Sequence, residues 1–251
     1  MASDSRKNPV RVSCFECPLR QKKHFRPFSS EELEFVSHFK RGDLNADAGA
    51  TVIVEGSHSA HLYTLLEGWG FRYKILEDGR RQILNYVVPG DMVGLQGAVM
   101  AEMQHSVEAL TPVTLCVFER SRLFNLFEKH AGLAFDLTWL AAREESILDE
   151  HLLSVGRRTA TERAAYLLAF LFERGRNAGL LDEDRRHVPV TQMHVADTLG
   201  LSIVHTNKTL RKLAERGLIQ WLDRGCEILD PEGLQAVANW NPGIPQLRPL
   251  I

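Results

Sequence analysis

The stretch Thr191–Ile219, TQMHVADTLGLSIVHTNKTLRKLAERGLI, decides the fold of this 251-residue chain. It reads as two short helices joined by a tight turn and followed by a strand. Gly200 stands where a left-handed residue would end the first helix, and Ser202 is placed to cap the second. The stretch therefore predicts a helix-turn-helix.

The second helix of this pair has two faces of different chemistry. Amide and cationic groups on a narrow helix can reach base edges in the major groove of DNA, whereas an ordinary solvated surface helix is the alternative. The predicted inward face is Thr206, Leu210 and Leu213, and the predicted outward face is Val204, Asn207, Lys208 and Arg211.

The outward residues differ in the bases that they could read. Val204 can pack against a thymine methyl, Asn207 can bridge adenine N6 and N7, and Lys208 can reach guanine O6 or N7. Residues to the side of this face are expected at backbone phosphates. The predicted DNA-binding set is Thr191, Ser202, Val204, His205, Asn207, Lys208, Thr209, Arg211 and Lys212.

Charge is divided unevenly along the chain. The net charge is −2, but residues 157–216 hold eleven Lys or Arg against seven Asp or Glu, so this segment is positive and the remainder negative. The longest apolar run, Ala165–Phe172, is too short to span a bilayer, and the N-terminus lacks the apolar core of a signal peptide. A cytoplasmic protein with one domain facing phosphates is expected.

Upstream of residue 121 the pattern is that of short strands. Runs such as TVIVE and VTLCVFER alternate with glycine turns, and EDG at 77–79 predicts a hairpin. Ser29 and Glu32 form a capping box at the start of a short helix before these strands. Strands at this spacing predict a β-roll of jelly-roll type.

Residues 123–156 read as one long helix with a leucine stripe. The stripe could pack on its own sheet or form a dimer seam, since periodicity allows both. The predicted fold class is α+β: a β-roll, a long helix and a C-terminal winged helix-turn-helix. The predicted divisions are an arm at 1–27, the roll at 28–122, the helix at 123–156, the winged helix at 157–235 and an irregular tail at 236–251.

This order of elements resembles the Crp/Fnr family of bacterial transcription regulators. The most specific pieces are LYTLLEGWGFRYKILEDGRRQILNYVVPGDMVG and LGLSIVHTNKTLRKLAERGLI. The resemblance implies a homodimer on a two-fold symmetric operator, with the long helix as the seam, and an RNA polymerase contact near the loop at 76–81. The predicted dimer interface is Leu137, Leu140, Glu144, Ile147, Leu148 and Leu152.

Cyclic-nucleotide sensors of this family bind the ribose with a Gly-Glu-x-Gly carboxylate and the phosphate with an Arg-Ser pair. Here Gly94-Leu95-Gln96-Gly97 and His105-Ser106 occupy those positions. Leu95 cannot accept a hydroxyl proton, and His105 lacks a guanidinium fork. Dependence on cyclic AMP is therefore not expected.

The oxygen-sensing branch carries an iron–sulfur cluster on four cysteines. Cys14, Cys17 and Cys116 match three of them, but Lys23 stands at the fourth position, followed by His24. A cluster completed by His24, another metal, a thiol switch and purely structural cysteines remain open, and Cys226 matches no ligand position.

Two further expectations concern assembly and chemistry. Oxygen sensors of the family have an acidic residue where this chain has Leu148, so the resemblance implies a more constitutive dimer. A cupin-like metal enzyme is the alternative of a different class, and it would need a His-x-His pair. His58 and His61 are three residues apart, and no nucleophile elbow or phosphate loop is present, so an enzyme is not expected.

Overall fold

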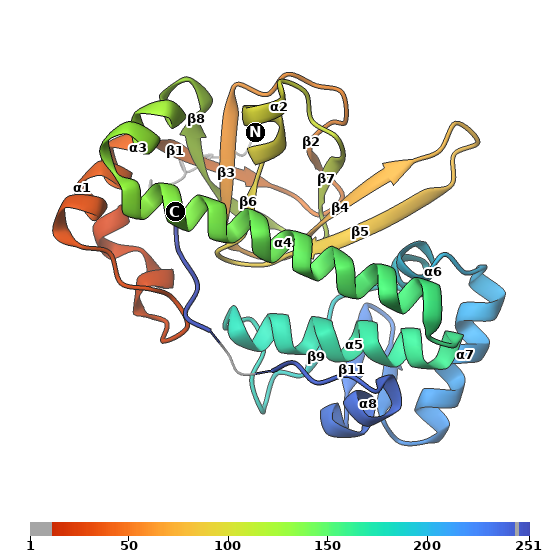
Figure 1. Cartoon of the computed structure of the whole chain (residues 1–251). Coiled ribbons are helices and arrows are strands. Elements are labelled where there is room, and N and C mark those ends of the chain that lie inside the picture. The colour runs from red at the N-terminus through yellow and green to blue at the C-terminus, as the bar shows by residue number, and fades with distance from the viewer. Residues whose placement is uncertain (1–11, 244–245) are drawn as a thin grey trace, which may run out of the picture.

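The computed structural model describes residues 12–243 and 246–251. A β-roll forms one half of the molecule, a mainly helical domain forms the other, and the long helix α4 (Ala131–Arg157) runs along both (Figure 1). The predicted α+β architecture is confirmed.

The roll consists of two four-stranded sheets, in the orders β1-β8-β3-β6 and β2-β7-β4-β5. Its strands are β1 (Lys40–Ala46), β2 (Thr51–Ile53), β3 (His61–Glu67), β4 (Gly70–Ile75), β5 (Arg81–Val87), β6 (Met92–Val93), β7 (Ser106–Ala109) and β8 (Val113–Glu119). The predicted hairpin joins β4 to β5, where Gly79 has φ +85°. Glycine suits this turn because a side chain would be strained at positive φ.

Short helices surround the roll. They are η1 (Cys14–Glu16), η2 (Pro18–Gln21), α1 (Ser30–Phe39), α2 (Leu95–Met100), η3 (Arg120–Arg122) and α3 (Leu123–Lys129). The predicted capping box is present, because Ser29 and Glu32 each accept the other's backbone N–H.

The single helix predicted over 123–156 is divided in two. The chain leaves the helical region at His130, with φ −132° and ψ 75°, so α3 ends there and α4 begins afterwards. Leucine periodicity alone could not reveal the corner, because apolar residues continue on both sides of it: Leu126 and Leu133 are both fully buried.

The C-terminal domain is a winged helix-turn-helix. It contains α5 (Ala160–Asn177), β9 (His187–Val188), α6 (Gln192–Leu199), α7 (Ile203–Glu215), β10 (Ile219–Leu222), β11 (Gly225–Ile228) and α8 (Pro231–Ala238). Strands β10 and β11 form the predicted wing, and Thr159 caps α5 as one of two predicted candidates.

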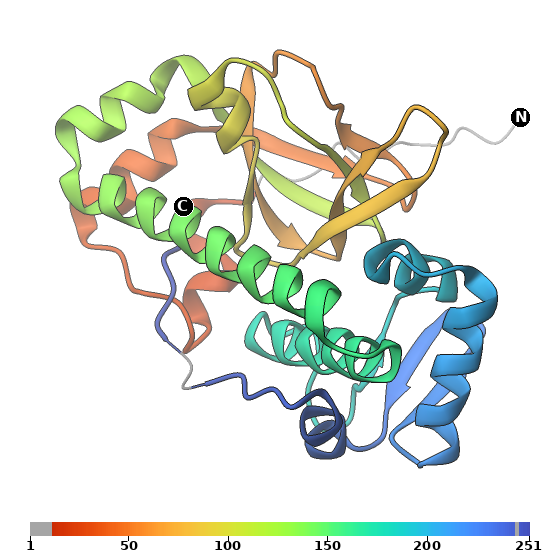
Figure 2. The same cartoon turned by 45° about the vertical axis from the view of Figure 1, so that its right-hand side comes forward.

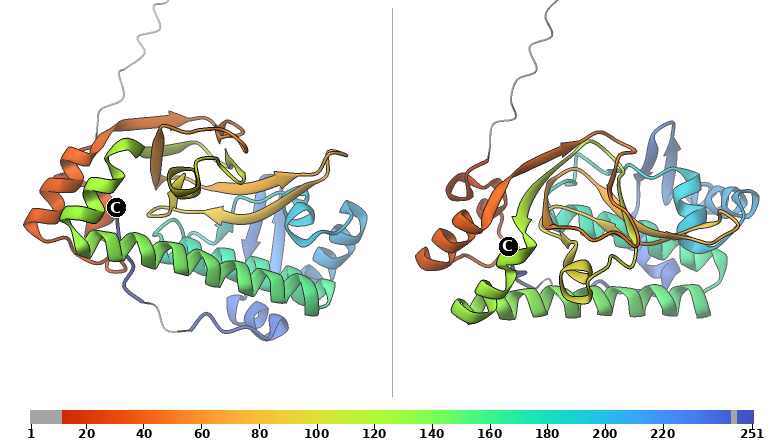
Figure 3. Two further views of the ribbon diagram at one scale, coloured as in Figure 1. Left: turned by 45° about the horizontal axis from the view of Figure 1, so that its top comes forward. Right: turned by 90° about the horizontal axis from the view of Figure 1, so that it is seen from above.

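One apolar core extends across both halves. Phe71 and Tyr86 of the roll belong to the same buried cluster as Leu168 of α5 and Leu210 of α7. In the described residues beyond α8 the chain forms no helix and only an isolated bridge between Arg248 and Phe25, and its last residues return to the far end of the roll (Figures 1 and 3). There Leu250 and Ile251 are buried beside Cys17 and Cys116.

Candidate DNA interface and sensor site

Helix α7 presents a polar, exposed face to solvent. Its N-terminus is fixed by Ser202, which accepts the backbone N–H of His205, and α6 ends at Gly200 with φ +65°. Thr206, Leu210 and Leu213 are buried as predicted. The exposed members of the predicted DNA set are Thr191, Ser202, Val204, His205, Asn207, Lys208, Arg211 and Lys212.

Thr209 is a correction to that set. Its side chain is 3% exposed, whereas that of Val204 is 76% exposed. Thr209 lies three residues after Thr206 and so shares the inward face of α7. A threonine in this position packs against the domain and is not available to a DNA phosphate.

The helix-turn-helix is attached to the β4–β5 hairpin of the roll, and Figure 2 shows α6 beside that hairpin. Arg81 forms an ion pair with Asp197 at 2.8 Å. Gln82 Nε2 donates to the Thr198 carbonyl at 2.9 Å, and Tyr86 Oη lies 2.9 Å from Thr198 Oγ1. These contacts, which the sequence did not predict, fix α6 relative to the sensor domain.

A cavity of about 570 Å³ lies between the roll and α4, where the family comparison placed the nucleotide site. Leu95 and His105 both line it. Burial, together with the charges of Arg72 and Lys74, lowers the pKa of His105 to about 3. His105 is therefore neutral at physiological pH and cannot replace the arginine that pairs with a cyclic phosphate.

The cysteines do not form a metal site in this arrangement. Cys14 and Cys17 lie on the arm against the apolar cluster that contains Cys116, yet no group of three or more His, Cys, Asp or Glu in residues 12–243 and 246–251 could hold a metal ion. Burial raises the pKa of Cys116 to about 12 despite the nearby Lys40 ammonium. A bound metal would itself deprotonate a coordinating thiol, so this raised pKa describes the free Cys116, and ligation by the three cysteines and His24 stays a prediction.

Cys226 is another cysteine whose thiol is buried and neutral. It lies on β11 of the wing, where its side chain is fully buried, and burial raises its pKa to about 12. A neutral, buried thiol packs as a small apolar side chain, which agrees with a cysteine that matches no ligand position.

The predicted dimer residues point in different directions from α4. Leu137 is 1% exposed within its own subunit, Glu144 pairs with Arg72, and Ile147 packs on the shared core. Leu140 and Leu148 are half-buried beside the cavity below the roll. Leu152, the sixth predicted residue, is 73% exposed, and Phe135 on the same helix is 68% exposed. Most of the predicted stripe thus packs within its own subunit, and the dimer interface itself stays a prediction.

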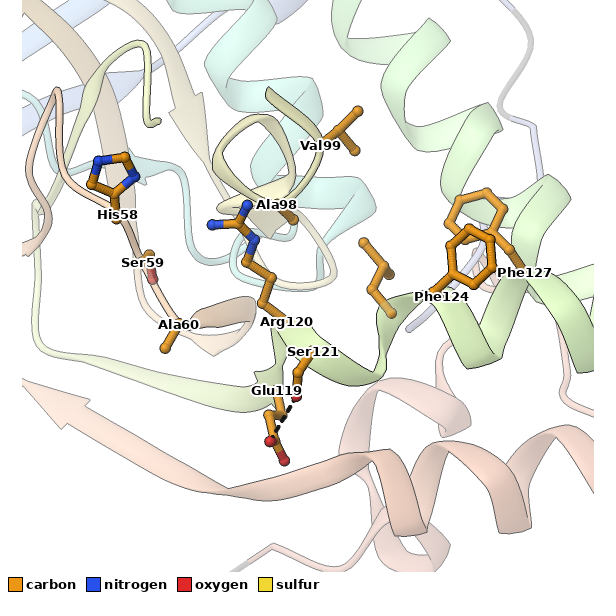
Figure 4. A pocket seen from close by; sticks show the side chains of 11 residues that line it. His58, Ser59, Ala60, Ala98, Val99, Glu119, Arg120, Ser121, Phe124 and Phe127 are labelled. Atoms are coloured by element: carbon orange, nitrogen blue, oxygen red, sulfur yellow. Dashed lines mark hydrogen bonds between the residues drawn. The ribbon is translucent and has the colours of Figure 1, made fainter. Parts of the chain in front are cut away.

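A shallow groove of about 860 Å³ opens on the roll, and Figure 4 shows its lining. His58 stands at one side, and the rings of Phe124 and Phe127 lie at the other. Ser121 Oγ donates a hydrogen bond to the Glu119 carboxylate at 2.7 Å, as drawn in the figure, so these two polar groups are paired with each other. Much of the remaining wall is apolar. His61 does not line this groove, so the two histidines of the cupin alternative do not converge on it.

Two domain families match the sequence. Residues 44–130 match the cyclic nucleotide-binding domain, and residues 162–237 match the Crp-like helix-turn-helix domain. No helix in the described part of the chain is both long and apolar enough to cross a membrane.

Curated relatives cover nearly the whole chain. The nitrogen fixation regulation protein FixK of Bradyrhizobium diazoefficiens is 32% identical over 227 residues, which are 90% of this chain and 93% of that protein. The transcriptional activator protein FnrL of Cereibacter sphaeroides is 28% identical over 209 residues, which are 82% and 83% of the two chains.

Solved structures share the fold. FixK2 from Bradyrhizobium japonicum superposes with a TM-score of 0.69 at 23% identity, covering 79% of this chain and 96% of that one. The order of domains, the exposed recognition helix and the matched families agree. The chain therefore belongs to the Crp/Fnr family of transcription regulators, on the Fnr-like side, and is not an enzyme.

Proposed function

We propose that the protein is a homodimer that binds a two-fold symmetric operator through its two α7 helices. The observation that carries this proposal is the outward face of α7, where Asn207, Lys208 and Arg211 are exposed together above a buried apolar face. Two such helices can occupy successive major grooves about one helical turn apart. A regulator of this kind acts on chromosomal DNA and so works in the cytoplasm.

The signal of this regulator is a redox, metal or small-ligand signal in the N-terminal half, and not a cyclic nucleotide. Neutral His105 argues against a cyclic phosphate. By family analogy, the exposed end of the hairpin near Leu76 contacts RNA polymerase, whereas Arg81 is already engaged by Asp197.

Selection of operators from random DNA, followed by binding assays with Lys208→Ala, tests this proposal. We expect the selected sites to be palindromic and the substitution to weaken specific binding by about 1–3 kcal/mol, because one base contact is lost. Binding of the wild type should also weaken as salt rises, because phosphate contacts release counterions.

Lys129→Ala is the matched control, since Lys129 is also exposed but lies at the end of α3 in the sensor domain. It should bind the operator as the wild type does. Equal operator affinity of Lys208→Ala and the wild type would remove α7 as the reading helix.

A further inference from the structure

Three guanidinium groups meet where the two halves of the molecule join. Arg143 comes from α4, Arg174 from α5 and Arg248 from the returning tail. Arg174 and Arg248 are 6% and 3% exposed, and both bind Asp91, Arg248 at 2.6 Å. One buried carboxylate is therefore the counterion of two buried arginines.

Arg143 is the third guanidinium and has no carboxylate partner within the described residues. Its contact there is the ring of Trp139, 5.4 Å from the guanidinium carbon, and its buried Nε has no hydrogen-bond acceptor. Burial and the charges of Arg174 and Arg248 lower its pKa to about 10, so it remains charged at neutral pH. Asp91 and Glu144 lie near enough to offset part of this repulsion, and an anion bound in the cavity would offset more of it.

A cavity of about 460 Å³ opens onto these groups. Arg143, Arg174 and Arg248 line it together with the rings of Tyr166, Phe170 and Trp240. The volume lies in the range of small-molecule sites, which combine apolar walls with a few polar groups.

The acidic residues in this cavity are already paired. Glu150 accepts from Arg158 at 2.8 Å, and Glu173 pairs with Arg176 at 3.3 Å. Glu144, the neighbour of Arg143 in the chain, accepts from both Arg72 and Asn85. The cavity therefore keeps a positive excess centred on Arg143.

We propose that this junction cavity binds a small organic anion, with its carboxylate or phosphate paired to Arg143 and its flat apolar part against the aromatic wall. This site adjoins the cavity between the roll and α4, because Arg143 and Arg174 line both, but Leu95 and His105 line only that other cavity. A ligand here would contact the sensor helix, the DNA-binding domain and the tail at once, and so would stabilise one relative placement of the two halves. That regulatory consequence rests on the proposed DNA-binding function, whereas binding itself does not.

Calorimetric titration of the full-length protein with benzoate tests the site, with inorganic phosphate as the second probe. We expect benzoate to bind, and Arg143→Gln to lower its affinity about tenfold or more, because a charge-assisted pair is lost. Arg157→Gln is the control, since Arg157 lies on the same helix but is exposed, and it should bind as the wild type does. Phosphate should bind more weakly, since it cannot use the aromatic wall.

Failure of both probes to bind at millimolar concentration, or unchanged affinity in Arg143→Gln, would overturn the proposal. Phosphate binding as tightly as benzoate would overturn the role of the aromatic wall. Thermal unfolding without ligand shows whether the variant is folded, and its midpoint should not decrease, because an unpaired charge has been removed. DNA is absent from these titrations, so their failure leaves the proposed operator binding intact, and loss of operator binding leaves this site testable.

Discussion

Several charged side chains are buried in the interior of this protein, and Asp91 is the clearest case. Burial alone would raise the pKa of Asp91, but the guanidiniums of Arg174 and Arg248 outweigh burial and lower it. Its Oδ2 also accepts the backbone N–H of Val88 at 2.7 Å, which closes the turn after β5. One side chain thus holds a loop of the roll, a helix of the DNA-binding domain and the tail.

Asp91→Asn should lower the free energy of unfolding by about 3–5 kcal/mol, because it leaves two buried arginines without a counterion. Urea unfolding followed by fluorescence measures this. Asp78→Asn is the control, since Asp78 pairs with Arg80 on the exposed hairpin and its loss should leave the free energy of unfolding nearly unchanged. A loss of less than 1 kcal/mol in Asp91→Asn would show that the two arginines find other partners.

At the scale of elements, α4 has three roles along its length. Its first turns pack on the roll through Leu133 and Leu137, its middle borders the cavities, and its last turns contact α5. His151 lies in that last contact, 3.0 Å from the Tyr166 hydroxyl and with its ring edge-on to Phe170. Its titration reports on the α4–α5 contact.

Stability should decrease as pH falls from about 6.5 towards 4. Burial, with the charges of Arg174 and Arg72, lowers the pKa of His151 to about 4 in the folded protein, whereas an unfolded histidine titrates near 6.5. The unfolded chain therefore binds more protons in this window, and one such group costs at most about 1.4 kcal/mol per pH unit. His105 acts in the same direction.

Urea unfolding at pH 7 and pH 5 tests this expectation. His151→Gln should reduce the loss between these pH values by about 1–2 kcal/mol, while His58→Gln, an exposed histidine, should leave it unchanged. The same pH dependence in His151→Gln and the wild type would mean that His151 is protonated in the folded state.

The outer face of α4 is where we expect the subunits to meet. Leu152→Glu places a charge at the most exposed leucine of that face and should shift the dimer towards monomer by tenfold or more in dissociation constant, about 1.4 kcal/mol. Sedimentation equilibrium measures the change. Leu76→Glu, at a leucine on the hairpin that is 57% exposed, should dimerise normally, and an unaffected Leu152→Glu dimer would place the seam elsewhere.

At the scale of the whole molecule, both the DNA-binding domain and the C-terminal tail contact the N-terminal half of the chain. The DNA-binding domain is held to the roll by the Arg81–Asp197 pair, and the tail crosses back to the arm, where Arg26 N–H donates to the Arg248 carbonyl at 2.8 Å. Thr64 on β3 donates to the Ile251 carbonyl, directly beside Cys116 in the sheet register. Changes near the cysteines can therefore reach the tail through direct contacts.

Leu250→Ala should destabilise the protein by about 2–4 kcal/mol, because the side chain is 5% exposed within the core of the arm and roll. Leu247→Ala, three residues earlier and 61% exposed, should change stability by less than about 0.5 kcal/mol. Chemical unfolding of the two variants measures the difference. Equal values would mean that the tail is not docked in solution.

Local sequence predicted much of this protein. The caps at Ser29 and Ser202, the left-handed Gly200, the hairpin at Gly79 and the wing depend on a few adjacent residues, and all of them form as expected. Such features are readable because their hydrogen bonds close within three or four residues. The strand β1 escaped prediction because KRGDLNA has no apolar alternation, and its pairing with β8 alone makes it a strand.

The sequence by itself carried the resemblance to the family, and its periodicity and local caps predicted the order of the elements and the exposed face of α7. The tertiary structure decided which face of α4 looks outward, that Thr209 is buried, that Cys14 and Cys17 pack in one apolar cluster with Cys116, and that Arg143, Arg174 and Arg248 converge. Those arginines lie up to about a hundred residues apart in the chain. Contacts at such separation depend on how whole elements pack, and spacing along a sequence does not encode them.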